Sequence, residues 1–350
     1  MASLPLALWV APVSNLAGVA RHIIDVARVG LPGWDLVVTA PRGPLLERLD
    51  DLGANTVALP LEDGVPAAVK AIRAIVKRIR PTVVHSHLAK ADFLATMATS
   101  GLGVRLVSTE HHISPDRFMF HPNRAEAVLM EAAHHARLRR FAHVIAVSDS
   151  TRRDMRKWWH TSVPITVILN GVDRPQTSPE RRPGLRMLSL TRLSAEKNVT
   201  ETIRAFARLV GEHPEATLTV AGSGPQAEPL AQMAHRLGLD GRVTFPGFVD
   251  AEKATTDHDV IVQPSRSDNC SYTLLDAVAR GMGVAASPIG GNPEFLPARC
   301  IAELGDVAAL AQTMADQGLH PNRRPELPDS VPTVAQMARG IVEVYDKVTP

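Results

Sequence analysis

Short apolar runs alternate along the chain with stretches in which apolar residues recur every three or four positions. The first run, residues 6–10, is typical of a buried strand, and the stretch 19–29 has apolar residues at helical spacing. The same alternation continues through residues 36–39, 44–52, 56–59, 65–79, 82–85, 89–99, 105–108, 144–147 and 166–168. Strands and helices that alternate with short loops predict an α/β fold, in which helices cover both faces of a parallel sheet.

The alternation is interrupted at residues 173–184, which are rich in proline and charge and show no periodicity. It resumes in residues 186–190, 199–211, 217–221, 226–237, 242–245 and 260–262, and a second proline-rich break, 319–332, precedes a final helix at 333–347. Segments of this composition commonly separate domains. We therefore predict two Rossmann-like domains, residues 1–172 and 185–332, joined by a linker at 173–184, with a deep cleft between their facing strand ends.

The stretch 263–294 is the strongest candidate for a ligand site. It begins at the end of an apolar run, passes through a polar loop and continues as a helical pattern. Asn269 and Ser271 are candidate caps of this helix, and two carboxylates, Asp268 and Asp276, flank its first turns. In open parallel sheets, ligands bind at the C-terminal ends of strands and against helix N-termini. The pattern therefore favours a site for phosphate and ribose groups.

Two cations follow the first predicted strand of the second half, namely Arg192 and Lys197 in the loop TRLSAEKN. Cations just past a strand end are well placed to hold a diphosphate. Ordinary surface charge is the alternative interpretation, and the strand-loop-helix context favours the diphosphate. In a neighbouring loop, Gly222 and Gly224 permit a close approach of the backbone, although one G-x-G pair is a weak signal.

Two pairs of histidines follow predicted strands of the first half. His85 and His87 end one strand, and His111 and His112 follow the next, so all four are predicted at the sheet edge where ligands bind. His85 and His87 have the spacing of zinc ligands on a strand, but no cysteine or carboxylate cluster accompanies them. We therefore predict no metal site. A histidine that meets a substrate hydroxyl is the interpretation we favour, above all for His111, and His85, His87 and His112 are candidates for the acceptor side.

Composition narrows the function classes. The 350 residues are 45% hydrophobic, which suffices for two cores, and the formal net charge of +2 gives no general case for nucleic acid. Two cysteines do not form a disulfide framework, so a reducing cytoplasm is the expected compartment. The apolar start, residues 1–12, has no preceding positive charge, and we interpret it as the first strand rather than a signal peptide. No stretch is long and apolar enough to cross a bilayer.

Two basic stretches could contact the acceptor or a membrane surface. Residues 113–140 begin irregularly and then form a helical pattern rich in histidine and arginine, which would suit an anionic or lipid-linked acceptor as well as a small polar one. The stretch 151–160, TRRDMRKWWH, could touch an anionic membrane surface, but a solvated helix face with one tryptophan in the core is the interpretation we favour. Asp257 and Asp259 form an Asp-x-Asp triplet that precedes a strand, at the wrong edge for a metal-diphosphate, and we assign it to a turn.

An ordered set of motifs resembles the retaining glycosyltransferases of family 4, which have the two-Rossmann-domain architecture called GT-B. The resemblance covers nearly the whole chain. It is carried by AGVARHIIDVA, PTVVHSHLAKA, VSTEHH, VIAVSDST, ILNGVD, RLSAEKN, VAGSGP, VTFPGFV, PSRSDNCSYTLLDAVARG and IGGNPE, in that order. Each motif alone is weak, and the order and spacing make the set specific.

The resemblance implies a role for each matching position. The second domain would bind a nucleotide diphosphate sugar, most simply a UDP sugar, and the final segment 333–350 would cross back onto the first domain. Arg192 and Lys197 would hold the diphosphate, Asp268 would face the donor sugar, and His111 would meet that sugar near its reacting carbon. The remaining donor-binding positions would be Gly18, Gly222, Phe248, Val249, Asn269, Cys270, Ser271 and Asp276.

Three departures from the family's usual pattern stand out. Asp268 and Asp276, with seven residues between them, occupy positions where the family usually has glutamate, so each carboxylate is shorter by one methylene. The loop before the first helix has one glycine, Gly18, where many relatives have two, and Asn198 stands where the family has a glycine. None of these changes removes a charge, so they bear on donor geometry and donor choice rather than on activity as such.

The resemblance implies sugar transfer with retention and without a metal or other cofactor, to a hydroxyl acceptor of surface polysaccharide, glycolipid or glycosylated metabolite synthesis. Preorganised cations and a helix N-terminus can stabilise the departing diphosphate. A sugar-nucleotide epimerase or a phosphorylase on the same fold is the second interpretation. A non-catalytic nucleotide-sugar-binding scaffold is the third, because both acidic positions carry aspartate.

Overall fold

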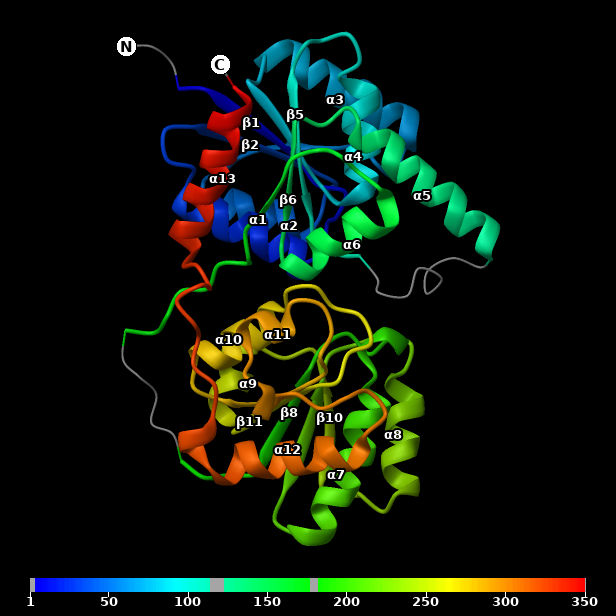
Figure 1. The fold of residues 1–350 in the computed structure, drawn as a ribbon, viewed down its shortest axis with the longest axis vertical. Coiled ribbons are helices and arrows are strands. Elements are labelled where there is room, and N and C mark those ends of the chain that lie inside the picture. The colour runs from blue at the N-terminus through cyan, green and yellow to red at the C-terminus, as the bar shows by residue number, and fades with distance from the viewer. Residues whose placement is uncertain (1–3, 114–122, 177–181, 350) are drawn as a thin grey trace. The chain divides into compact units, whose positions relative to one another are not determined.

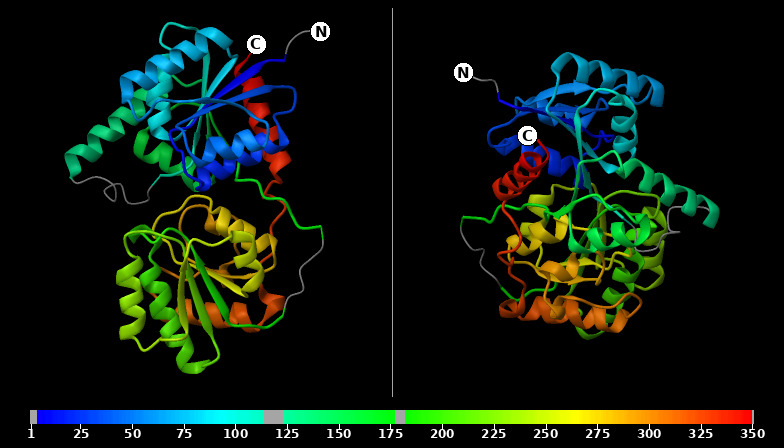
Figure 2. Two further views of the ribbon diagram at one scale, coloured as in Figure 1. Left: turned by 180° about the vertical axis from the view of Figure 1, so that it is seen from behind. Right: turned by 45° about the horizontal axis from the view of Figure 1, so that its top comes forward.

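The computed structural model describes residues 4–113, 123–176 and 182–349. The chain forms two compact units, residues 1–171 with 332–350, and residues 172–331. Figure 1 shows that each unit is a sheet with helices on both of its faces, and the further views in Figure 2 show the same layering. The second half of the polypeptide thus forms one unit, except for a C-terminal segment that belongs to the first.

The first unit is built on a seven-stranded parallel sheet in the order β3-β2-β1-β4-β5-β6-β7. Its strands are β1 (Leu6–Val10), β2 (Asp35–Ala40), β3 (Asn55–Ala58), β4 (Val83–His87), β5 (Arg105–Glu110), β6 (His143–Ala146) and β7 (Ile165–Val167). Because the order reverses between β1 and β4, the ends of these two strands form the switch point at which ligands bind in sheets of this kind.

Helices cover both faces of this sheet. They are α1 (Gly18–Val29), α2 (Pro44–Asp51), α3 (Val65–Ile79), α4 (Leu88–Ala98), α5 (Arg124–Leu138), α6 (Asp149–Trp159) and the C-terminal α13 (Val334–Val348). Side chains of α1, α2 and α13 form one core cluster with residues of β1 and β2, and those of α3, α4 and α6 form another. The alternation of residues along β1 divides it between the two cores, because Ala7 and Trp9 belong to the first, and Leu8 and Val10 to the second.

The helix α13 completes the first unit although it comes last in sequence. Its N-terminus is fixed by a capping box between Thr333 and Gln336. Near its other end, Tyr345 is fully buried and accepts a hydrogen bond from the indole nitrogen of Trp9 at 2.7 Å. Helix α13 also lies against α1.

The second unit has a five-stranded parallel sheet in the order β10-β9-β8-β11-β12. Its strands are β8 (Arg186–Leu190), β9 (Thr217–Ala221), β10 (Val243–Gly247), β11 (Val260–Gln263) and β12 (Gly283–Ala286). Its helices are α7 (Val199–Glu212), α8 (Ala227–Arg236), α9 (Ala251–Asp257), α10 (Tyr272–Ala279), α11 (Asn292–Phe295) and α12 (Val307–Leu319). Helices α7, α8 and α12 share one core with the sheet, α9 contacts β8, and α10 contacts β11 and β12.

One helix and the end of one strand differ from the predictions made from the sequence. Helix α12 is absent from the predictions above, although Asp306 caps it by accepting a hydrogen bond from the Ala309 amide at 2.8 Å. Strand β4 reaches His87, two residues beyond its predicted end.

Cys270 and Cys300 are buried free thiols. Across the described residues, no helix has both the length and the apolar character needed to span a membrane.

Candidate functional site

The candidate site of the second unit lies where β8 and β11 run side by side. These strands are neighbours in the sheet although β9, β10 and the helices α7, α8 and α9 lie between them in sequence. The loops that follow them therefore emerge at the same sheet edge. They touch directly, because the Arg266 amide donates a hydrogen bond to the Glu196 carbonyl at 2.8 Å and the Asn198 side chain donates to the Pro264 carbonyl at 3.1 Å.

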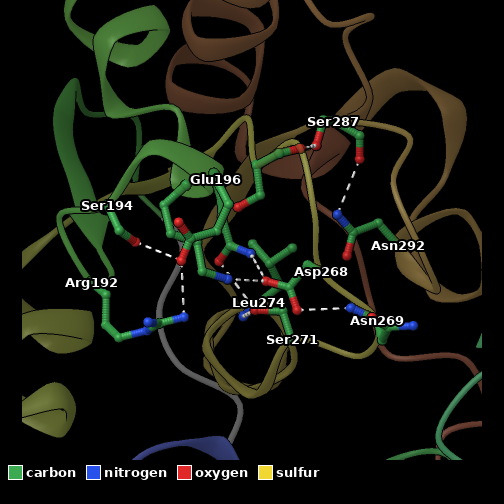
Figure 3. A network of polar contacts seen from close by, with 12 residues as sticks. Arg192, Ser194, Glu196, Asp268, Asn269, Ser271, Leu274, Ser287 and Asn292 are labelled. Carbon is green, nitrogen blue, oxygen red and sulfur yellow. Dashed lines mark hydrogen bonds and ion pairs between the residues drawn. The ribbon is translucent and has the colours of Figure 1, made fainter. Parts of the chain in front are cut away.

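Lys197 and Asp268 form an ion pair across the two loops. The ammonium lies 2.8 Å from a carboxylate oxygen of Asp268, and both side chains are about 15% exposed. Gln263 donates to the same carboxylate oxygen at 2.9 Å, and the Asn269 amide donates to the other oxygen at 2.9 Å. Figure 3 shows Asp268 at the centre of these contacts. The short aspartate side chain is therefore fully oriented by its neighbours.

Glu196 forms an ion pair with Arg192, the exposed cation of the same loop. One of its carboxylate oxygens accepts hydrogen bonds from Arg192 at 3.0 Å and from the Ser194 hydroxyl at 2.6 Å (Figure 3). Burial alone would raise the pKa of Glu196, but the Ser194 hydrogen bond and the charges of Arg192 and Lys197 lower it. Since the Arg192 side chain is 67% exposed, its guanidinium is accessible to an anion. No pattern in the sequence had singled out Glu196.

Helix α10 begins just after Asp268, the acidic member of the ion pair with Lys197. Ser271 caps it by accepting from the Leu274 amide at 3.4 Å, and the Ser271 hydroxyl donates to Gln263 at 3.1 Å. Cys270 is buried at the same turn, and Asp276 lies partly exposed on the helix. Gln263 thus connects the cap of α10 to Asp268, a link that the sequence reasoning missed because Gln263 looked like an ordinary strand end.

Two glycines let the loops pack this closely. Gly290 has φ +60°, and a Cβ there would stand 2.0 Å from the carbonyl oxygen of Asp268. Gly222 has φ +131°, and a Cβ would stand 1.9 Å from the carbonyl oxygen of Thr191. Both positions therefore require glycine for conformation and for space. For Gly222, the close approach is to the protein's own backbone, which the sequence could not distinguish from an approach to a ligand.

Asn198, at the position where the resemblance implies a glycine, has a left-handed backbone conformation. Its φ is +53°, in the left-handed region that asparagine tolerates better than most residues. Its side chain donates to Glu201 at 2.6 Å and to the Pro264 carbonyl. The substitution therefore adds a contact between the loops that follow β8 and β11.

Phe248 and Val249 follow the end of β10, the edge strand that β9 separates from β8 in the sheet. The Phe248 side chain is 85% exposed, whereas Val249 is half-buried. An exposed aromatic ring can stack on a planar group such as a nucleobase.

The Asp-x-Asp triplet lies at the opposite edge of the sheet. There Asp259 accepts hydrogen bonds from the amide and the guanidinium of Arg186 at 2.8 to 2.9 Å, so Asp259 has a structural partner.

In the first unit, His85 does not lie where the sequence placed it. It is fully buried inside β4 because the strand continues to His87. The indole N–H of Trp9 can only donate, so Tyr345 accepts from it and gives its own proton to Nδ1 of His85, at 2.7 Å. Nε2 of His85 then donates to Thr109 at 2.8 Å. Both ring nitrogens have partners in the core, so we withdraw His85 as an acceptor-side candidate.

The other first-unit candidates are at or beside the predicted edge. Gly18 is the exposed first residue of α1, and His111 and His112 follow β5 and are partly exposed. His87 ends β4 and is buried, with its Nδ1 3.0 Å from Nε2 of His111. His22, which the sequence analysis did not single out, projects from α1 into the same group.

A buried charge cluster lies next to this edge. Arg137 of α5 forms ion pairs with Asp92 and with Glu110, the latter at 3.0 Å. Ser86 and Ser108 also donate to Asp92, at 2.5 and 2.9 Å. Burial lowers the pKa of Arg137 to about 9. These contacts fix the C-terminal end of α5 on the sheet at Glu110, the residue just before His111 along the chain.

The basic stretch 151–160 lies mainly on α6. Trp159 is buried and stacks on His134 with ring centroids 4.2 Å apart, and the side chain of Lys157 lies 4.1 Å over the ring of Trp158. Arg152 and Arg153 form ion pairs with Asp149. This arrangement fits a solvated face with one tryptophan in the core. Of the segment 113–140, whose histidine and arginine content would suit an anionic acceptor, residues 114–122 lie outside the described residues.

Comparisons with known proteins find a matching family for each of the two units. The family described as Glycosyltransferase Family 4 matches residues 16–175, and that described as Glycosyl transferases group 1 matches residues 184–317, so the two matches together take in most of the chain. A glycogen synthase of Mycobacterium tuberculosis is 30% identical over 228 residues, which are 61% of this chain and 54% of that protein. The chain therefore spans about half the length of that curated relative.

Two further likenesses extend over more of the chain. A 2-deoxystreptamine N-acetyl-D-glucosaminyltransferase of Streptomyces fradiae is 27% identical over 323 residues, covering 83% of this chain and 74% of that protein. The crystal structure of Anabaena HepE in complex with UDP and glucose superposes with a TM-score of 0.77 at 18% identity, covering 98% of this chain and 100% of that one. The predicted α/β class with two Rossmann-like units is confirmed.

Proposed function

We propose that this chain, which belongs to the family 4 glycosyltransferases of the GT-B type, moves a hexose-type sugar from a nucleotide diphosphate sugar to a hydroxyl group of an acceptor. The observation that carries the proposal is the edge of the second sheet, where Lys197, Arg192 and the start of α10 converge. We favour a UDP sugar as donor, and the complex of Anabaena HepE with UDP and glucose supports that choice.

The cations supply what the leaving group needs. When the bond from the anomeric carbon to the diphosphate breaks, negative charge develops on the phosphate oxygens. Lys197 and Arg192 would stabilise that charge, together with the dipole of the N-terminus of α10. Lys197 is already oriented by Asp268, so little reorganisation is needed when the diphosphate binds. This supports transfer without a metal at the diphosphate.

Retention of configuration follows in our proposal from attack on the sugar's front face. The acceptor hydroxyl forms the new bond to the anomeric carbon while the bond to the diphosphate breaks, and its proton passes to the departing phosphate oxygen. No side chain is required as a covalent nucleophile. Asp268 would accept a hydrogen bond from a donor-sugar hydroxyl, and Asp276 would bind the ribose.

The remaining donor contacts are proposed as follows. Phe248 and Val249 would meet the base, the Phe248 ring being exposed for stacking. From the first unit, Gly18 would approach the diphosphate and His111 the donor sugar. His112 and the helical part of 113–140 stay as acceptor-side proposals, and their histidine and arginine content suits an anionic or lipid-linked acceptor.

A donor screen tests the proposal. The full chain would be incubated with UDP-, GDP- and ADP-linked hexoses, and the release of nucleoside diphosphate and free sugar would be followed by mass spectrometry. We expect slow hydrolysis of donors that share one nucleobase, with the anomeric configuration of the product kept when an acceptor is supplied. Binding without turnover across acceptors would instead favour the scaffold interpretation. Absence of binding to every nucleotide sugar would refute both.

A further inference from the structure

Three histidines converge in the first unit from three different elements. His22 comes from α1, His87 from the end of β4 and His111 from the residue after β5, and one ring nitrogen of each lies within 4.8 Å of the others. Their ring centroids are 4.9 to 5.6 Å apart. His22 and His87 are buried, whereas His111 is partly exposed. All three belong to one compact unit, whereas the proposed diphosphate cations belong to the other.

The spacing of these nitrogens is near that of a metal centre. Two imidazole ligands on a tetrahedral zinc ion are separated by roughly 3.3 Å, given zinc–nitrogen bonds of 2.0–2.1 Å. The Nδ1 of His87 and the Nε2 of His111 are 3.0 Å apart. Small rotations of the rings would therefore bring the three nitrogens onto one ion.

The protonation of the cluster also suits a metal. Burial lowers the pKa of each ring, to about 4 for His22 and well below the usual range for His87 and His111, and repulsion from neighbouring histidines, His85 among them, lowers it further for the last two. Neutral imidazole keeps one lone pair, which is the form that binds metal ions. For His22, Nδ1 faces the Asn170 side-chain oxygen at 3.4 Å, so Nδ1 carries the proton and Nε2 the lone pair.

The two ring nitrogens of His87 have different surroundings, because Nδ1 faces Nε2 of His111 at 3.0 Å. The Nε2 of His87 is buried and, within the described residues, has no hydrogen-bond partner. Nearly all buried side-chain nitrogens have one. His85, which stacks on His87 at 4.6 Å, shows the contrast, because Tyr345 and Thr109 occupy both of its nitrogens. Packing accounts for both nitrogens of His85. In His87, Nδ1 is the nitrogen that would bind the ion beside His111, and the buried Nε2 would then carry the proton.

We propose that His22, His87 and His111 form a binding site for a divalent transition-metal ion of the zinc class. Three neutral imidazoles select Zn²⁺, Co²⁺, Ni²⁺ or Cu²⁺ over Mg²⁺ and Ca²⁺, which prefer oxygen ligands. Three protein ligands leave the fourth position to water or to a ligand on the partly exposed side of His111. Asn170 acts as the positioning residue, because its hydrogen bond fixes the ring of His22. The ion would also hold His111, the residue proposed for the donor sugar.

The test uses Co²⁺ as a spectroscopic probe on the full chain, purified without a histidine tag and stripped with a chelator. We expect one tight Co²⁺ per chain with the visible absorption of a four-coordinate site, which stoichiometric Zn²⁺ removes. His22→Gln is expected to abolish the band. Asn170→Ala is expected to weaken binding about 10- to 100-fold. His235→Gln, which changes a histidine that is 76% exposed, is the matched control and should leave the band unchanged.

Two results would overturn the site. One is the absence of a stoichiometric Co²⁺ band in the native chain, and the other is a band of unchanged affinity in the His22 variant, which would place the ion on other histidines among the 14. If His22→Gln fails to fold, His111→Gln carries the same test at a partly exposed position. Thermal unfolding with and without Zn²⁺ is a second readout, since an ion that binds only the folded chain raises Tm in the native chain and not in the variants. None of these measurements depends on sugar transfer.

Discussion

The ammonium of Lys197 lies 2.8 Å from a carboxylate oxygen of Asp268 and thereby joins the loops that follow β8 and β11. The two residues are 71 positions apart in the chain. Because Asp268 is also held by Gln263 and by the Asn269 amide, the ion pair has one defined geometry. A diphosphate that binds Lys197 would enter a site in which the cation is already fixed.

Lys197→Ala is expected to lower kcat/KM for transfer on the order of 10²–10³-fold, because it removes a cation that acts on the developing phosphate charge. Donor hydrolysis should fall by a similar factor. Lys70→Ala, at an exposed position on α3, is the control and should leave both rates unchanged. Wild-type rates in the Lys197 variant, measured by nucleotide release, would show that the diphosphate assignment is wrong.

Asp268→Glu should reduce activity, although glutamate is usual at this position in the family. The aspartate accepts from Gln263, Asn269 and Lys197 at 2.8 to 2.9 Å, and an added methylene displaces the carboxylate from at least one donor. Loss of one or two such hydrogen bonds is expected to lower kcat/KM about 10-fold. Steady-state kinetics on the preferred donor check this. A glutamate variant as active as the native chain would mean that the position is not tuned to aspartate.

Gly290→Ala should destabilise the second unit by about 2–4 kcal/mol, because φ is positive and the new Cβ would overlap the Asp268 carbonyl oxygen. Gly238→Ala is a matched control, since it has φ +69° but nothing within 4 Å of a Cβ, and it should cost only about 1 kcal/mol. Urea unfolding of both variants separates backbone strain from loop packing. Equal costs would contradict the close approach at Gly290.

Tyr345→Phe should destabilise the first unit, because it removes the hydroxyl that joins Trp9 to His85. The ring remains, so packing against Trp34 is kept. Each buried group left without a partner is expected to cost about 1–3 kcal/mol. The free energy of unfolding in urea measures the loss. A neutral result would mean that water replaces the hydroxyl.

Cys300 should resist thiol reagents in the folded chain. Its side chain is fully buried, and burial raises the pKa of the thiol to about 12, so the reactive thiolate is scarce at pH 8. We expect no labelling of Cys300 in the native chain on the time scale in which guanidinium-unfolded chain reacts at both cysteines. Peptide mapping by mass spectrometry distinguishes Cys300 from Cys270. Rapid native labelling of Cys300 would indicate local opening near α12.

Local patterns in the sequence predict the elements and the edge of the sheet at which we propose the donor site. Hydrophobic period encodes strands and helices locally, so the alternation from residue 6 to 263 could be predicted, and polar residues after strands marked the loops with Arg192, Lys197 and Asp268. The proline-rich, charged composition of residues 173–184 likewise predicts a linker between two domains. These features depend on near neighbours in the chain, which is why a single sequence reveals them.

Which of these residues contact one another depends on the tertiary fold. Lys197 and Asp268 pair only because β8 and β11 are adjacent in the sheet. His85 is a core residue because Tyr345, from the far end of the chain, bonds its ring. His22 lies in a helix whose pattern gives no hint of His87 and His111, and only strand order and helix packing bring the three together. Contacts between distant segments depend on topology, which the local pattern of a sequence does not carry.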